Sequence, residues 1–210
     1  MFPSERSTIK QKETEMEVTT LSYDNLHNHG ELFANMFRAR HRAFIQQNKW
    51  DLPQSNGMEF DQYDTPASRW VAVHTDGEVL AGIRLTPTTH RCGIYSYMIR
   101  DAQRGLLETI PSNLLNYPAP VSEEIWESSR VFVSESVPAA LRLRVQLQLR
   151  QEMVNAAREL GATSVLGLIP EASRRIGRRV GLECEPVGPI LNFDGLDCVC
   201  VTINMAPKLH

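Results

Sequence analysis

The chain has 210 residues, of which 42% are hydrophobic, so it can form one ordinary core without disulfides or metal ions. Its formal charge of −3 argues against a dedicated nucleic-acid-binding protein. No segment has the apolar length of a signal peptide or a membrane span, so we expect a cytoplasmic protein with neither.

The first predicted elements follow a polar N-terminus. We expect residues 1–16 to be a flexible tail and residues 17–210 to be a single domain. A strand over 18–22 precedes a helix over about 30–47, whose apolar residues recur every three or four positions. Arg40 falls on this apolar stripe, where an arginine must be paired, line a cavity or extend to the rim.

A long polar connection over residues 48–69 contains Trp50 and the motif Glu-Phe-Asp-Gln-Tyr-Asp at 59–64. Connections of this length in compact domains are usually functional or disordered. Asp61 and Asp64 are therefore candidate site residues, although Asp61 could simply cap a turn and Trp50 could be a core aromatic.

A hairpin is predicted from 70–74 and 78–86, because Asp76-Gly77 is a strong turn signal. Arg84 interrupts the apolar second strand and is a further candidate. A helix over about 98–107 and a Pro- and Asn-rich loop over 111–120 follow.

The next strand, over 125–134, contains Glu127, Ser129 and Arg130. In a regular strand, residues three apart point to opposite faces, so Glu127 and Arg130 could share one site only if a β-bulge lies beside them. The alternative is a structural ion pair. Ser129 has no histidine placed to activate it, so we do not expect a nucleophile.

The C-terminal part continues with a helix that opens at Pro138 and ends near Gly161, a strand over 164–169, a short helix over 172–180 and a strand over 196–204. Cys198 and Cys200 alternate within the last strand and are expected in the core. The cysteines have no metal-ligand spacing, so no metal site is predicted.

Residues 138–180 carry a positive charge inside an acidic protein, with eight arginines against three glutamates. The common explanation of such a run is a solvated helix surface, and the alternative is a docking site for an acidic partner.

This order of elements resembles the acyl-CoA N-acyltransferase (GNAT) fold. The resemblance implies an α/β (α+β) protein, an αβα sandwich with a mixed central sheet and flanking helices. In that fold, the sheet splays open at a bulged strand, where a thioester enters. The segment 134–140 lacks the glycine-rich pyrophosphate loop of the common acetyltransferases, which makes an ordinary CoA-dependent acetyltransferase a less favoured reading.

The polar motifs resemble one branch of that fold, the acyl-homoserine-lactone synthases of bacterial quorum sensing. The resemblance covers roughly residues 18–182. It rests on Arg40-x3-Phe44-x5-Trp50, on the motif at 59–64, on Arg84-Leu85-x-Pro87-Thr88 and on Trp126-Glu127-x-Ser129-Arg130.

The resemblance implies that an acyl group passes from a thioester to the amine of S-adenosylmethionine, which then forms a lactone and releases methylthioadenosine. S-adenosylmethionine is a substrate here, and no cofactor is expected. Glu127 matches the candidate base, while Asp61, Asp64, Arg84 and Arg130 match the catalytic polar network. The residues that match the S-adenosylmethionine side of the cleft are Arg40, Phe44, Trp50 and Ser129.

The expected acyl donor is acyl carrier protein, a small acidic protein, with acyl-CoA as the alternative. The basic surface expected to dock it comprises Arg142, Arg144, Arg150, Arg174, Arg175, Arg178 and Arg179. Two other functions remain open. One is a different acyl-CoA-dependent N-acyltransferase, and the other is a catalytically silent relative that binds the carrier protein or an acyl ligand.

Overall fold

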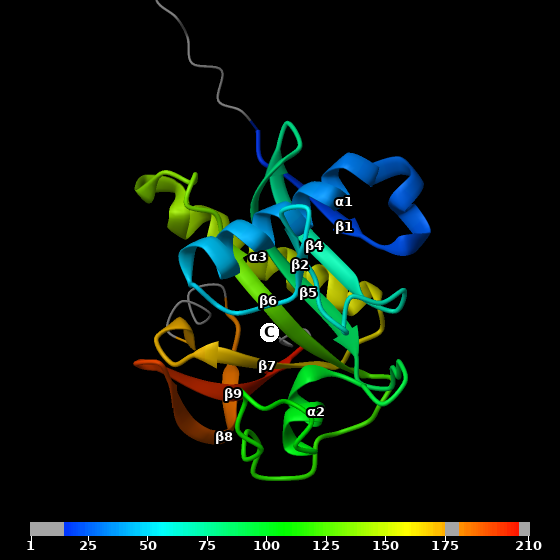
Figure 1. Ribbon diagram of the computed structural model, residues 1–210, viewed down its shortest axis with the longest axis vertical. Helices are drawn as coiled ribbons and strands as arrows, with labels where there is room; N and C mark the ends of the chain where they lie inside the picture. Colours follow the sequence, from blue (N-terminus) through cyan, green and yellow to red (C-terminus); the bar gives the residue numbers. More distant parts are fainter. Residues whose placement is uncertain (1–14, 175–180, 206–210) are drawn as a thin grey trace, which may run out of the picture.

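The computed structural model describes residues 15–174 and 181–205, and its described strands form one seven-stranded mixed sheet and one two-stranded ribbon (Figure 1). The large sheet has the order β1-β4-β5-β6-β7-β9-β8. Its strands are β1 (Glu17–Leu21), β4 (Arg69–Thr75), β5 (Glu78–Pro87), β6 (Ile125–Val133), β7 (Ser164–Pro170), β8 (Cys184–Phe193) and β9 (Leu196–Asn204). Among the described strand pairs of this sheet, only β6–β7 is parallel.

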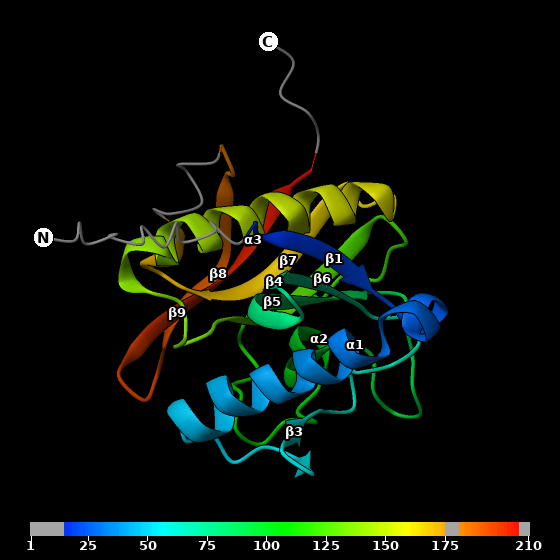
Figure 2. The ribbon, with the colours of Figure 1, turned by 90° about the horizontal axis from the view of Figure 1, so that it is seen from above.

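The helices lie on both faces of this sheet. Figure 2 shows α3 (Ala139–Glu159) on one face, with α1 (Leu26–Arg40) and α2 (Met98–Gln103) on the other. The π-helix η2 (His41–Gln47) continues α1, and the 3-10 turn η1 (Tyr23–Asn25) precedes it. The three layers confirm the predicted αβα sandwich.

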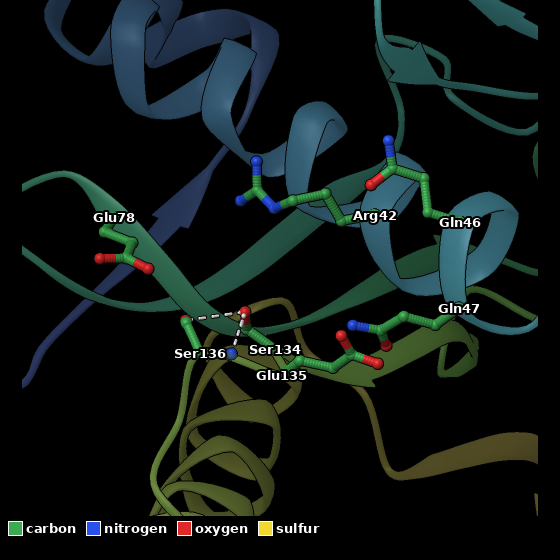
Figure 3. Close-up of a pocket in the computed structure, with 7 residues that line it drawn as sticks. All are labelled: Arg42, Gln46, Gln47, Glu78, Ser134, Glu135 and Ser136. Carbon is green, nitrogen blue, oxygen red and sulfur yellow. Dashed lines mark hydrogen bonds between the residues drawn. The ribbon is translucent and has the colours of Figure 1, made fainter.

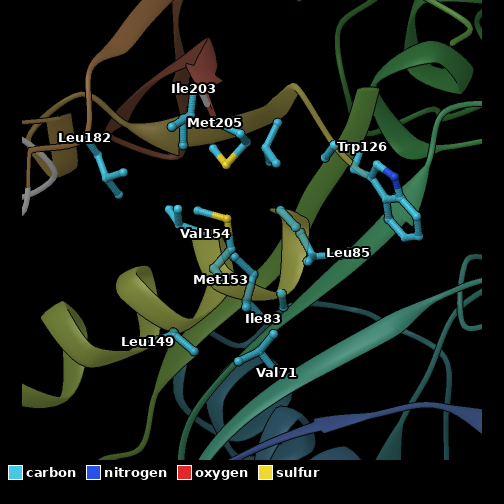
Figure 4. Close-up of a cluster of buried hydrophobic side chains, with 14 of the residues drawn as sticks. Val71, Ile83, Leu85, Trp126, Leu149, Met153, Val154, Leu182, Ile203 and Met205 are labelled. Atoms are coloured by element: carbon cyan, nitrogen blue, oxygen red, sulfur yellow. The ribbon is translucent and has the colours of Figure 1, made fainter. Parts of the chain in front are cut away.

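The main core lies between α3 and the sheet. Apolar residues of α3 such as Leu149 and Met153 face Val71, Ile83 and Leu85 from β4 and β5 (Figure 4). Side chains on β5 alternate between the two faces of the sheet. Ile83 and Leu85 point toward α3, so the residues next to them in β5 point toward α1 and α2.

A β-bulge lies in β6 at the predicted place. Gly82 of β5 pairs with Phe132, but Arg84 pairs with Ser129, so two residues of β6 oppose one residue of β5. Arg130, one of these two, has φ of 54°. The predicted bulge is therefore confirmed.

Strands β6 and β7 pair over only part of their length. The pairing runs from Ile125↔Ser164 to Ser128↔Gly167, and the second half of each strand lies beyond the last described β6–β7 pair. The parallel strands thus separate just after Ser128, beside the bulge.

Most predicted elements are observed with shifted bounds. The Asp76-Gly77 turn is confirmed, with φ values of 48° and 81°, and α2 is shorter than the predicted helix over 98–107. The connection over 48–69 contains a short ribbon that was not predicted, β2 (Gln54–Ser55) and β3 (Met58–Glu59).

One whole strand, β8, was missed. It turns into β9 through Asp194-Gly195, the same dipeptide that marks the first hairpin, with φ values of 50° and 87°. Most of the predicted helix over 172–180 and of the predicted tail over 1–16 lies outside the described residues. Among the described helices, none is both long and apolar enough to cross a membrane.

Candidate active site

Three arginines and three carboxylates, with side chains that are at most 13% exposed, form a closed ring on the α1 face of the sheet. Each arginine contacts two of the acids, and each acid contacts two of the arginines. Following the ring, the contacts are Glu59–Arg40 (2.6 Å), Arg40–Asp64 (2.6 Å), Asp64–Arg84 (3.0 Å), Arg84–Asp61 (2.5 Å), Asp61–Arg130 (2.8 Å) and Arg130–Glu59 (3.1 Å). Three positive and three negative charges cancel, which lowers the penalty for burying them.

The ring joins four parts of the chain that are distant in sequence. Arg40 is the last residue of α1, Glu59 ends β3, Arg84 lies in β5 and Arg130 sits at the bulge of β6. The bulge brings Arg130 to the same face of the sheet as Ser129 and Arg84. The paired, buried Arg40 resolves the question raised by its place on the apolar stripe, since only 1% of it is exposed.

The turn at 61–64 is also stabilised by hydrogen bonds from its own backbone amides to its aspartate side chains. The Asp61 amide donates to Asp64 Oδ2 at 2.8 Å, and the Tyr63 amide donates to Asp61 Oδ1 at 2.8 Å. Asp61 therefore caps a turn and also contacts two ring arginines, so the two interpretations of this residue are compatible.

The electrostatics of the ring favour the fully ionised state. Burial alone would raise the pKa of Asp61 and of Asp64, but the facing arginines outweigh it and lower both. For Arg84, burial would lower the pKa, but contacts with Asp61 and Asp64 raise it.

Glu127 stands apart from the ring. Its side chain is fully buried and accepts hydrogen bonds from the amides of Met98 (3.1 Å) and Ile99 (2.7 Å) at the start of α2. Burial raises its pKa to about 7, although those amides and Arg84 act in the opposite direction. A carboxyl group with this pKa exchanges a proton near neutral pH, as a general base must.

Two aromatic rings cover the arginine side of the site. Phe44 of η2 stacks on Trp50 with a centroid distance of 5.3 Å and an interplanar angle of 5°. The Arg130 guanidinium lies 5.6 Å from the centroid of Phe44. Phe44 is buried, whereas 45% of Trp50 is exposed, so the outer ring of this stack is accessible to a ligand.

Ser129 lies between Glu127 and Arg130 and accepts a hydrogen bond from Arg84 Nε at 3.1 Å. The structure therefore brings Arg40, Asp61, Asp64, Arg84, Arg130 and Ser129 together and places Glu127 and the Phe44–Trp50 stack next to members of this set.

The sequence interpretation missed two members of this network. Glu59 was read only as part of the motif, although it closes the ring between Arg40 and Arg130. The second is Asp101, which is fully buried. It accepts hydrogen bonds from Tyr63 Oη (3.1 Å) and Ser96 Oγ (2.7 Å). It links the acid motif to α2, but a single aspartate in a short helix gives no sequence signal of this role.

The arginines predicted to dock a carrier protein differ in their contacts. Arg142 donates to the carbonyl of Ser134, and Arg150 donates to that of Gln146. Arg174 pairs with Glu171 at 2.7 Å. Arg144 is exposed and has no partner among the described residues, while Arg175, Arg178 and Arg179 lie outside them.

A polar recess of about 390 Å³ lies outside the ring, between η2 and the segment that joins β6 to α3 (Figure 3). Arg42, Gln46 and Gln47 line it from η2, opposite Ser134–Ser136. It contains none of the predicted site residues.

Comparison with known proteins places this geometry in context. The family model of autoinducer synthases matches residues 24–202. An acyl-homoserine-lactone synthase from Ralstonia solanacearum is 29% identical over 171 residues, which cover 79% of this chain and 78% of that protein.

Solved structures share the fold. TofI, in a ternary complex with an inhibitor and MTA, is 25% identical with a TM-score of 0.70, and the match covers 91% of each chain. The CoA-dependent acyl-homoserine lactone synthase BjaI, with SAM and isopentyl-CoA, has a TM-score of 0.72 at 20% identity, over 92% of this chain and 85% of that one. The predicted fold is thereby confirmed.

Proposed function

Since the chain belongs to the autoinducer synthase family, we propose that it transfers an acyl group from a thioester to the amine of S-adenosylmethionine and then closes an acyl-homoserine lactone. The observation that carries this proposal is the separation of two electrostatic environments on one face of the sheet. One is the ionised ring, and the other is Glu127, whose pKa lies near 7.

In the acyl transfer, the amine of S-adenosylmethionine attacks the thioester carbonyl. The ammonium form must first lose a proton, and Glu127 accepts it, directly or through water. A C–N bond forms, the C–S bond of the thioester breaks, and the new amide nitrogen loses a second proton. One of the two protons passes to the departing thiolate, and the other is released to solvent.

In the second step, the carboxylate of the acylated substrate attacks its own γ-carbon. The new C–O bond closes the lactone, the bond from the γ-carbon to the sulfonium breaks, and neutral methylthioadenosine leaves. This step releases no proton, so it needs orientation rather than a base.

The ring is suited to orienting the substrate. Arg40 and Arg84 already use all three guanidinium nitrogens, so they hold the acids rather than a substrate. Arg130 contacts acids through Nε and Nη2 only, and it is the most exposed of the three. We assign Arg130 to the substrate carboxylate and the Phe44–Trp50 stack to the adenine or the sulfonium.

Acyl carrier protein is the donor that we favour. The thioester would enter where β6 and β7 separate, and α3 begins a few residues after β6 ends. Arg144, in the first turns of α3, is exposed and unpaired within the described chain, as a contact for an acidic partner should be. The CoA-dependent relative keeps acyl-CoA as the alternative donor.

The proposed function is tested with purified protein, S-adenosylmethionine, and matched panels of acyl carrier protein and CoA thioesters, followed by mass spectrometry. We expect both a lactone and methylthioadenosine. Acylation without methylthioadenosine would support the alternative N-acyltransferase, whereas binding without turnover would support a silent relative.

The donor is tested by charge reversal in the same assay. Arg144→Glu should raise the KM for acyl carrier protein by roughly 3- to 10-fold, because the contact lies on an exposed rim. Arg91→Glu is the matched control, since Arg91 is also exposed and unpaired in the described chain but precedes α2. Equal effects of the two changes would reject the assigned surface.

A further inference from the structure

Thr86 carries a buried hydroxyl group that lacks a described hydrogen-bond partner. The residue has no exposed surface, and its Oγ1 has no hydrogen-bond partner in the part of the chain that the structure describes. Thr88, two residues further along, has two such contacts, to the carbonyl and the amide of Ser122. Buried hydroxyls are almost always hydrogen-bonded, so the isolation of Thr86 requires an explanation.

The strand register places Thr86 directly opposite Glu127. The two residues pair across β5 and β6, as Arg84 pairs with Ser129 two positions earlier on β5. Side chains of a directly opposed pair share one face, with Cβ atoms about 5 Å apart. Because Leu85 packs in the core on the α3 face, Thr86 points to the opposite face, where the ring lies.

Several titratable groups surround Glu127 on this face. The charges that act on its pKa come from Arg84 of β5 and from Asp61 of the acid motif. Burial raises the pKa of three neighbours, Tyr63 in the motif, Tyr97 before α2 and Cys200 in β9, and the charge of Glu127 adds to each of these shifts. Its described hydrogen-bond partners are the Met98 and Ile99 amides, which donate only.

A hydroxyl differs from these amides because it both donates and accepts. Thr86 therefore offers Glu127 a partner in either protonation state. No described hydrogen bond joins the two side chains directly, and one water can bridge two polar groups that lie too far apart for a direct hydrogen bond.

Resting on the proposed function, we propose that Thr86 is the positioning residue for proton transfer at Glu127. Its hydroxyl holds, through one water, the ionised carboxylate before the reaction and the carboxylic acid after it. The water that takes the proton from the substrate amine is thereby fixed against Glu127. No bond is made to Thr86 itself. Of the two protons that the substrate nitrogen loses, one ends on the thiol product and the other in solvent.

Replacing Thr86 by valine distinguishes a purely structural role from a role in positioning Glu127. Valine has nearly the same shape as threonine and lacks the buried, unpartnered hydroxyl. If Thr86 only filled space, Thr86→Val would be neutral or stabilising and the titration of Glu127 would not change. If the hydroxyl supports the carboxylate, its loss raises the pKa of Glu127, because a hydrogen bond to the ionised form is stronger than one to the neutral acid.

The test is a carboxyl ¹³C NMR titration of the substrate-free protein with labelled glutamate. The Glu127 signal is assigned by its loss in Glu127→Gln. We expect Thr86→Val to raise the midpoint by about 0.5–1 pH unit, without lowering the melting temperature. Thr86→Ser should restore the wild-type midpoint, and Thr20→Val in β1, far from the site, should leave it unchanged.

The same shift should appear in the acid limb of the pH profile of kcat/KM, with little change in the KM for S-adenosylmethionine. An unchanged midpoint in Thr86→Val, or equal effects of the valine and serine variants, would overturn the role of Thr86. Because the NMR titration needs no turnover, it separates this outcome from failure of the proposed function, which would appear as absence of lactone from the wild-type protein.

Discussion

At the scale of single residues, the neighbours of each buried acid decide whether it holds a proton. Burial would raise the pKa of all three acids, but the facing arginines outweigh it at Asp61 and Asp64, which stay ionised. At Glu127 burial dominates over the amides and Arg84 and raises the pKa to about 7. The acid motif that is most visible in the sequence therefore organises the cleft, and a less conspicuous glutamate in a strand carries the proton chemistry that we propose.

Replacing Glu127 tests this division of roles. Glu127→Gln keeps the size of the side chain but removes the base, so kcat should fall by about 10²- to 10⁴-fold, with a small change in the KM for S-adenosylmethionine. Steady-state kinetics with the preferred donor measures both. Glu124→Gln, at an exposed position just before β6, is the control. A wild-type rate in Glu127→Gln would remove Glu127 from the role of base.

Residue types and spacing were enough to predict most of the ring. A charged residue on an apolar stripe or strand is visible in a sequence, and this signal located Arg40 and Arg84. The ion pairs of the ring were not visible in the sequence, because their partners lie up to 71 positions apart, as Arg130 and Glu59 do.

At the scale of elements, a few close backbone contacts hold the site together. The loop over 111–120 lies against β8, where the Asn116 amide donates to the carbonyl of Val187 at 3.0 Å. At the adjacent Gly188, a Cβ atom would lie 1.8 Å from the carbonyl oxygen of Leu114. Leu114 and Leu115 pack in the cluster that also contains residues of α2, whose amides hold Glu127.

Gly188→Ala should therefore displace this loop. The contact is with backbone, which cannot rotate away, so we expect a loss of about 3 kcal/mol in the free energy of unfolding. Urea unfolding measures it. The control is Gly30→Ala in α1, where a Cβ meets nothing within 4 Å, and which should stabilise the protein by about 0.5–1 kcal/mol. Equal stability of Gly188→Ala and wild type would contradict the close approach.

The elements also show where local patterns carried enough information. The bulge in β6 follows from requiring Glu127 and Arg130 on one face, and it is present. Strand β8 was missed because its apolar residues are interrupted by Pro186, Gly188 and Pro189, although Asp194-Gly195 marked the hairpin. Its pairing with β9 shifts register between Pro186 and Ile190, which accommodates these residues.

At the scale of the whole molecule, the buried charges make stability depend on pH in two opposite ways. The ring acids have lowered pKa values, so their contribution is present above the ordinary carboxyl pKa and is lost as the pH falls through their folded values. Glu127 has a raised pKa, so its contribution is complete below about 4.5 and is lost as the pH rises through about 7.

The contribution of Glu127 to stability should consequently decrease between pH 5 and pH 8. The shift of Glu127 from 4.5 to about 7 corresponds to at most about 3 kcal/mol. Urea unfolding of wild type and Glu127→Gln at both pH values measures it, since the variant should lack this part of the decrease. Other groups, such as His74 with its lowered pKa, contribute equally to both proteins and cancel in the comparison. Parallel pH dependence of the two proteins would contradict the raised pKa.

The local information in the chain was sufficient for the order of most elements, the hairpin turn, the bulge and the residue types of the site, because periodicity, turn residues and misplaced charges are short-range signals. The ring closes, the strands β6 and β7 separate, and Thr86 meets Glu127 only when strands distant in sequence are brought into register. Folding the chain converts a set of charged residues into one neutral ring and one isolated carboxyl group, because pKa depends on burial and on neighbours in space.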